Sequence, residues 1–143
     1  MGLFDFVKAA GQKLGFVDDD DDAKKATALK QEIDKYSLGS EKIDVAVVGD
    51  KVTLKGEAPS QEALEKIVLA AGNVEGIGAV ETDVEAPEPS ERVLHTVESG
   101  DSLWKIAEKA YGNGSRYNEI FEANRPMLSD PDKIYPGQVL RIP

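Results

Sequence analysis

A short proline-rich, acidic stretch divides this chain and limits what each part can fold into. Residues 86–91 read Ala-Pro-Glu-Pro-Ser-Glu, and proline opposes helices and central strands because its φ is fixed and it lacks an N–H group. The chain has 143 residues, so each flanking stretch is long enough for one small unit with a single core. We therefore expect two domains of different sequence, joined by a linker at 86–91.

The stretch before the linker switches between helical and strand periodicity. Apolar residues recur every three or four positions in two segments and alternate with polar residues in three others. Gly49-Asp50 is typical of a tight hairpin turn. The predicted elements are a helix at 23–37, strands at 43–47 and 51–55, a helix at 60–71 and a strand at 80–84. This order predicts an α+β unit with a three-stranded sheet and helices on one face.

A further helix is predicted ahead of this unit, at residues 3–14. One apolar stripe at helical spacing is formed by Leu3, Phe6, Val7, Ala10 and Leu14. An amphipathic membrane anchor is the alternative, but the stripe is short and basic residues are few. We expect the helix to pack on the domain that follows it.

The stretch after the linker predicts a β-α-α-β unit. Asp101 or Ser102 can cap the first helix, and Pro126 stops the second. The predicted elements are a strand at 93–97, helices at 103–110 and 117–124, and a closing strand at 139–142. The fold class is therefore α+β in both halves.

Composition excludes several classes of function. The chain has no cysteine, so disulfides, thiolate metal sites and cysteine nucleophiles are ruled out. A net charge of −10 opposes binding to nucleic acid and to anionic membranes. The sequence contains no apolar stretch of about 18 residues, so it predicts no membrane span. The start, Met-Gly-Leu-Phe-Asp-Phe-Val-Lys, lacks the unbroken apolar run of a secretory signal, so we expect a cytoplasmic protein.

No residue pattern predicts catalysis. His95 is the only histidine, and it has no nucleophile or set of metal ligands to act with, so we expect a structural role for it. The acidic residues are scattered rather than paired in a catalytic motif. The glycine-rich turn at 72–78 follows a helix and lacks the Lys-Ser/Thr of a phosphate-binding loop. We expect no enzyme activity and no catalytic residues.

Two family resemblances cover nearly the whole chain. The stretch "VTLKGEAPSQEALEKIVLAAGNVEGIGAVETDV" resembles a BON domain, and "TVESGDSLWKIA" with "IYPGQVLRIP" resembles a LysM domain. Together with the opening octet, they resemble the cytoplasmic bacterial potassium-binding proteins of the BON–LysM type. The resemblance implies a domain division into an N-terminal helix at 1–17, a BON domain at 18–85, the linker, and a LysM domain at 92–143.

The resemblance also implies a ligand, potassium, held by backbone carbonyls from two segments. Carried onto this sequence, the candidates are the carbonyls of Val7, Lys8, Ala10, Gly72, Val74 and Ile77. This is chemically reasonable because the last carbonyls of a helix lack intrahelical partners and carry partial negative charge. Potassium is commonly held by rings of such carbonyls.

The implied function is a monomeric cytoplasmic potassium sensor or buffer that changes shape on binding. Two alternatives stay open. One is a LysM protein that binds peptidoglycan or N-acetylglucosamine, with Trp104 as a stacking surface. The other is a cytoplasmic scaffold whose LysM domain binds an unidentified protein partner.

Overall fold

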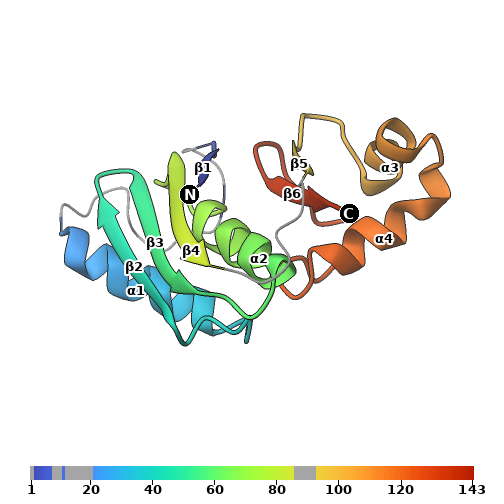
Figure 1. Cartoon of the computed structure of the whole chain (residues 1–143). Coiled ribbons are helices and arrows are strands. Elements are labelled where there is room, and N and C mark those ends of the chain that lie inside the picture. The colour runs from blue at the N-terminus through green and yellow to red at the C-terminus, as the bar shows by residue number, and fades with distance from the viewer. Residues whose placement is uncertain (1, 8–10, 12–20, 86–92) are drawn as a thin grey trace.

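The computed structural model of the chain describes residues 2–7, 11, 21–85 and 93–143. Two units lie side by side, with helix α2 (Gln61–Gly72) of the first facing strand β6 (Val139–Ile142) of the second (Figure 1). The predicted linker at 86–91 lies outside the described residues. No helix within the described ranges is both long and apolar enough to cross a membrane.

The first unit is a four-stranded sheet covered by two helices. Its strands follow the order β1-β4-β3-β2, in which β3 and β4 are parallel and the other neighbours antiparallel. Besides α2, the elements are β1 (Gly2–Asp5), α1 (Asp22–Asp34), β2 (Ile43–Val48), β3 (Lys51–Glu57) and β4 (Ala79–Glu85). The five elements predicted between residues 23 and 84 are confirmed, as is the α+β class.

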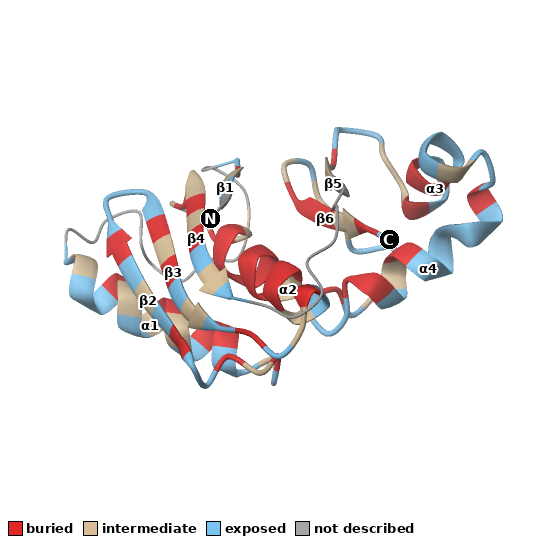
Figure 2. Ribbon diagram, in the orientation of Figure 1, coloured by how far each residue is buried: buried red, intermediate tan, exposed pale blue. Residues whose placement is uncertain are grey.

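Local chemistry explains where these elements begin and turn. The Asp21 carboxylate caps α1, and the Ser60 hydroxyl accepts the N–H of Ala63 at 3.0 Å to cap α2. Gly49 has a positive φ of 63° and turns the chain between β2 and β3. Most residues of α2 are buried, because the sheet of the first unit covers one side of the helix and the second unit covers another (Figure 2).

The prediction of a helix at 3–14 is wrong at the residues of that range that the structure describes, 3–7 and 11. Residues 2–5 form β1, which pairs with β4 so that Leu3 lies opposite Glu81 and Phe4 opposite Val80. The apolar spacing in this short segment fits both a helix and a strand. The segment forms a strand because pairing with the open edge of β4 gives it backbone hydrogen bonds. The sheet therefore has four strands instead of the three predicted. Residues 8–10 and 12–14 lie outside the described part of the chain.

The second unit has the predicted β-α-α-β order. Its elements are β5 (Val93–Thr96), α3 (Leu103–Tyr111), the short 3-10 helix η1 (Gly114–Arg116), α4 (Tyr117–Ala123) and β6. The Ser102 hydroxyl caps α3, and Gly112, with a φ of 71°, ends it. A small core formed by both helices and the sheet holds the unit together.

Candidate cation site

The turn after α2 supplies backbone carbonyls in a buried setting. Asn73 ends the helix, and its N–H donates to the Leu69 carbonyl at 2.9 Å. The side chains of Val74 and Ile77 are fully buried, so they anchor the turn in the core. Gly76 between them has a φ of 101°, a conformation that favours glycine. Apolar side chains therefore fix the turn in the core, and its polar groups are those of the backbone and the side chains of Asn73 and Glu75.

The N-terminal segment lies directly on this turn. The Phe6 N–H donates to the Gly78 carbonyl at 3.0 Å. The Phe6 ring rests on Gly72, where an added β-carbon would lie 2.1 Å from Phe6 Cζ. Gly11 has a φ of 110°, and a β-carbon there would lie 2.6 Å from the carbonyl carbon and oxygen of Asn73. Two stretches more than 60 residues apart in sequence thus meet backbone to backbone.

The predicted site residues can now be placed. Gly72, Val74 and Ile77 all belong to the turn, and Val7 follows Phe6, which lies on it; the Val7 side chain is 42% exposed. The Val74 carbonyl accepts the N–H of Ile77 at 3.1 Å, which leaves one of its two lone pairs for another partner. Lys8 and Ala10 lie outside the described residues. The structure brings the two segments together, and the convergence of these oxygens on one point stays a prediction.

The electrostatics of the turn favour a cation. The C-terminal end of a helix carries partial negative charge, and the last turn of α2 contains no basic residue that would compete with an ion. Among the described residues, no group of three or more His, Asp or Glu side chains is placed to hold a metal. The carbonyls at the end of α2 are candidates for holding a cation because they carry partial negative charge.

The LysM-like unit has a polar network at its first loop. Asp101 accepts the N–H of Glu98 at 3.0 Å and lies 3.1 Å from His95 Nε2. The hydrogen bond from Glu98, and then the one with His95, lower the pKa of Asp101. His95 therefore holds the loop between β5 and α3, which is the structural role predicted for it.

An aromatic pair on the same unit is partly open to solvent. Trp104 is 50% exposed, and its ring centroid lies 6.1 Å from that of Tyr117. The indole rests on Gly114, where a β-carbon would lie 2.3 Å from Nε1. Trp104 is thus held in place with part of its surface exposed, and the contribution of Tyr117 was not predicted from the sequence.

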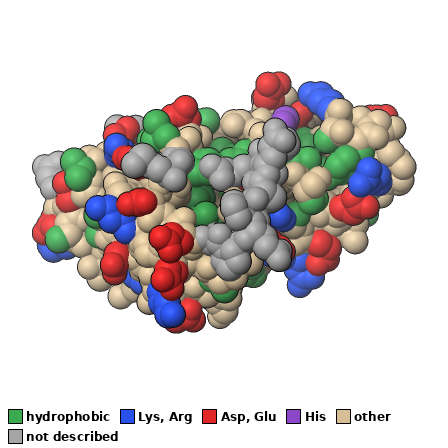
Figure 3. Space-filling model, in the orientation of Figure 1, with side chains coloured by type: hydrophobic (Ala, Val, Ile, Leu, Met, Phe, Trp, Pro, Cys, Tyr) green, Lys and Arg blue, Asp and Glu red, His purple; other side chains and the backbone are tan. Residues whose placement is uncertain are grey.

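The contact between the two units contains polar side chains that sequence reasoning missed. The Asn73 amide bonds both backbone groups of Val139, at 2.8 and 2.9 Å. Arg141 Nε lies 3.4 Å from Glu65 Oε1, and both side chains are largely buried. Figure 3 shows hydrophobic side chains gathered in the middle of the molecule, over α2 and between the units. An asparagine beside glycines signals a turn, but nothing in the sequence indicates its partner 66 residues away.

Comparisons with known proteins show which domain family each unit matches. A BON domain model matches residues 20–87, and a LysM domain model matches residues 95–143. The potassium binding protein Kbp of Escherichia coli O6:H1 is 47% identical over 150 residues, covering 100% of this chain and 99% of that protein. An uncharacterized protein of Deinococcus radiodurans is 34% identical over 145 residues, covering 92% of this chain and 56% of its own length. The SpoIVD-associated factor A of Bacillus subtilis is 46% identical over 50 residues, covering 35% of this chain and 12% of that protein.

Proposed function

Because this chain belongs to the BON–LysM family that includes the potassium binding protein Kbp of Escherichia coli, we propose that it binds potassium and acts as a cytoplasmic sensor or buffer of that ion. The proposal is one of binding rather than catalysis. The observation that carries it is the meeting of Phe6 and Gly11 with the turn at 72–78, where the Phe6 ring lies on Gly72 and Gly11 lies against the backbone of Asn73.

The proposed ligands are the backbone oxygens of Val7, Lys8, Ala10, Gly72, Val74 and Ile77. Potassium is large and weakly hydrated, so a ring of carbonyls can replace its water shell. Sodium is smaller and holds its water more tightly, so a wide ring replaces that water less well. The selectivity follows from this difference and needs no charged side chain.

Ion binding would also change the conformation. Without the ion, carbonyl oxygens that point toward one another repel. With potassium bound, residues 6–11 would be held against the turn, and the Phe6 ring would stay on Gly72. Potassium would then stabilise the folded monomer by mass action, as any ligand of the native state does.

A titration of ion-free protein with potassium and with sodium, followed by amide NMR, tests the proposal. We expect shifts in residues 6–11 and 72–78 with potassium at concentrations where sodium gives little change. Equal responses to the two ions at matched ionic strength would contradict the proposed selectivity.

A second candidate function concerns the LysM-like unit, and the exposed Trp104–Tyr117 pair favours it. Such a surface can stack on a sugar ring or on part of a protein partner. Retention on insoluble peptidoglycan that is lost in Trp104→Ala would support glycan binding. Retention of a protein partner that ignores potassium would support a scaffold.

A further inference from the structure

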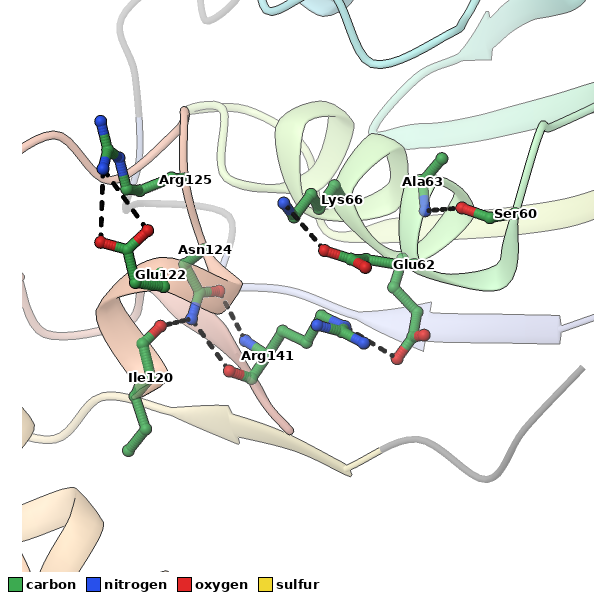
Figure 4. A network of polar contacts seen from close by, with 10 residues as sticks. Ser60, Glu62, Ala63, Lys66, Ile120, Glu122, Asn124, Arg125 and Arg141 are labelled. Atoms are coloured by element: carbon green, nitrogen blue, oxygen red, sulfur yellow. Dashed lines mark hydrogen bonds and ion pairs between the residues drawn. The ribbon is translucent and has the colours of Figure 1, made fainter. Parts of the chain in front are cut away.

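The outer edge of strand β6 is completed by two asparagine side chains. Asn73 Nδ2 donates to the Val139 carbonyl at 2.8 Å, and the Val139 N–H donates to Asn73 Oδ1 at 2.9 Å. Asn124 makes the same pair of bonds with Arg141, at 2.9 and 2.7 Å (Figure 4). Alternate residues of β6 thus each have their backbone groups matched by one amide, as a neighbouring strand would match them.

The two asparagines differ in origin. Asn124 follows α4 and belongs to the same unit as β6, whereas Asn73 belongs to the first unit. Val139 is itself buried and packs with the core of the first unit. If the units separated, the N–H and C=O of Val139 would both lose their protein partner. The bonds of Asn73 therefore help to set the position of the second unit.

A second buried polar contact between the units, the ion pair of Glu65 and Arg141, contributes less to docking than these bonds. The Glu65 side chain is 5% exposed and that of Arg141 is 17% exposed. Within the described residues, Glu65 Oε2 and Arg141 Nε are buried and have no hydrogen-bond partner. A buried ion pair with unmet hydrogen bonds contributes little net stability, because desolvation offsets the attraction. Docking of the units therefore depends more strongly on the bonds of Asn73 than on this ion pair.

Asn73 also lies within the proposed ion-binding turn. Its backbone touches Gly11, and its neighbours in the chain are Gly72 and Val74, two of the proposed ligands. The Gly72 carbonyl belongs to the peptide group that includes the Asn73 nitrogen, so turning this carbonyl toward an ion changes the φ angle of Asn73 and with it the direction of the Asn73 Cα–Cβ bond. That direction decides whether the amide can meet both groups of Val139 at once.

We propose that Asn73 is the positioning residue through which potassium occupancy of the turn controls docking of the LysM unit onto the BON unit. Its carbonyl neighbours respond to the ion, and its amide holds β6. The inference rests on the proposed function, because it requires potassium to bind at residues 72–78.

The test measures ion binding and docking separately in the full chain. The chain contains no cysteine, so Lys55→Cys and Glu108→Cys, both at exposed positions, can carry spin labels on the two units. Pulsed electron resonance gives the distance distribution with and without potassium chloride. Amide shifts of residues 72–78 report binding, and those of Val139–Ile142 report docking.

In the unsubstituted protein we expect potassium to narrow the distance distribution and shift both sets of amides. In Asn73→Ala, the turn should still respond to potassium, with affinity changed by less than about tenfold, while the response of β6 is lost. Removing two hydrogen bonds should lower the docking equilibrium constant by about tenfold or more. Asn73→Asp keeps an acceptor for the Val139 N–H and loses the donor, so it should fall between the two.

Asn113→Ala is the matched control. It removes an exposed asparagine whose side chain caps η1 through Ser115, far from the contact between the units, and it should behave as the parent does. If Asn73→Ala and Asn73→Asp both keep the response of β6, the proposal is overturned while potassium binding stands. If the parent shows no response in residues 72–78, the proposed function fails and the inference fails with it. Should Asn73→Ala not fold, the Asn73→Asp result decides.

Discussion

The contact between Phe6 and Gly72 predicts that Gly72→Ala destabilises the parent protein but stabilises a variant in which Phe6 is replaced by alanine. Gly72 is the last residue of α2 and has no positive φ, so alanine suits its backbone. The obstacle is the Phe6 ring, because a β-carbon at Gly72 would lie 2.1 to 2.3 Å from three of its atoms. Gly72→Ala should therefore expel the ring, and Phe6→Ala should remove the obstacle.

The magnitude follows from the burial of Phe6, which is 9% exposed. Exposing a buried phenylalanine costs about 1.5–3 kcal/mol, while replacing a helical glycine by alanine stabilises by up to about 1 kcal/mol. In the parent, Gly72→Ala should thus destabilise by about 0.5–2 kcal/mol. In the Phe6→Ala background, the same change should stabilise the protein by up to about 1 kcal/mol. The coupling between the two positions is then about 1.5–3 kcal/mol.

Urea unfolding of the parent, both single variants and the double variant provides the assay, with unchanged m-values as the condition for comparing midpoints. Potassium titration of the same four proteins gives a second measurement. Both single variants should bind potassium more weakly, because the N-terminal segment has lost its anchor on the turn. If Gly72→Ala changed the free energy of unfolding by the same amount in both backgrounds, the packing of Phe6 on Gly72 would be refuted.

Three further changes test other parts of the account. Gly11→Ala should weaken potassium binding by about tenfold or more, because the φ of 110° at Gly11 and the nearby Asn73 backbone leave no room for a side chain. Calorimetric titration measures the affinity, and an unchanged affinity would contradict the contact between Gly11 and Asn73. The lowered pKa of Asp101 stabilises the fold above its unfolded value of about 3.9, and this contribution is lost as the pH falls through the lower folded value. Acid unfolding of Asp101→Asn should lack that component, and an identical acid profile would argue against it. Burial raises the pKa of Tyr135 to about 12, so its stabilising contribution is complete below about pH 10 and is lost as the pH rises toward 12. Tyr135→Phe should remove this alkaline dependence in thermal unfolding, and an unaltered alkaline limb would count against it.

Most elements could be predicted because their signals are local. The cap at Ser60, the hairpin at Gly49-Asp50 and the apolar periodicity of α2 each lie within a few residues of the structure that they specify. Strand β1 could not be predicted in this way. Its pattern fits both periods, and the edge of β4 that selects a strand lies more than 70 residues away.

In the candidate site, too, the local features could be predicted from the sequence and the long-range contacts could not. Glycines after a helix indicate an unusual turn, and the family resemblance pointed to its partner segment. The contacts of Phe6 with Gly72, and of Gly11 with Asn73, depend on three-dimensional packing. The role of the Asn73 side chain was missed because an amide that bonds a distant strand has the same sequence signature as one that only caps a helix.

The central claim is that backbone oxygens from the N-terminal segment and from the turn after α2 surround one large monovalent cation. A crystal grown with rubidium in place of potassium tests this directly, because anomalous scattering locates the ion. The account predicts an anomalous peak between residues 7–11 and 72–77, ringed by peptide oxygens. Strong anomalous peaks elsewhere with none at this turn, or oxygens there already bonded to amide N–H groups, would contradict it.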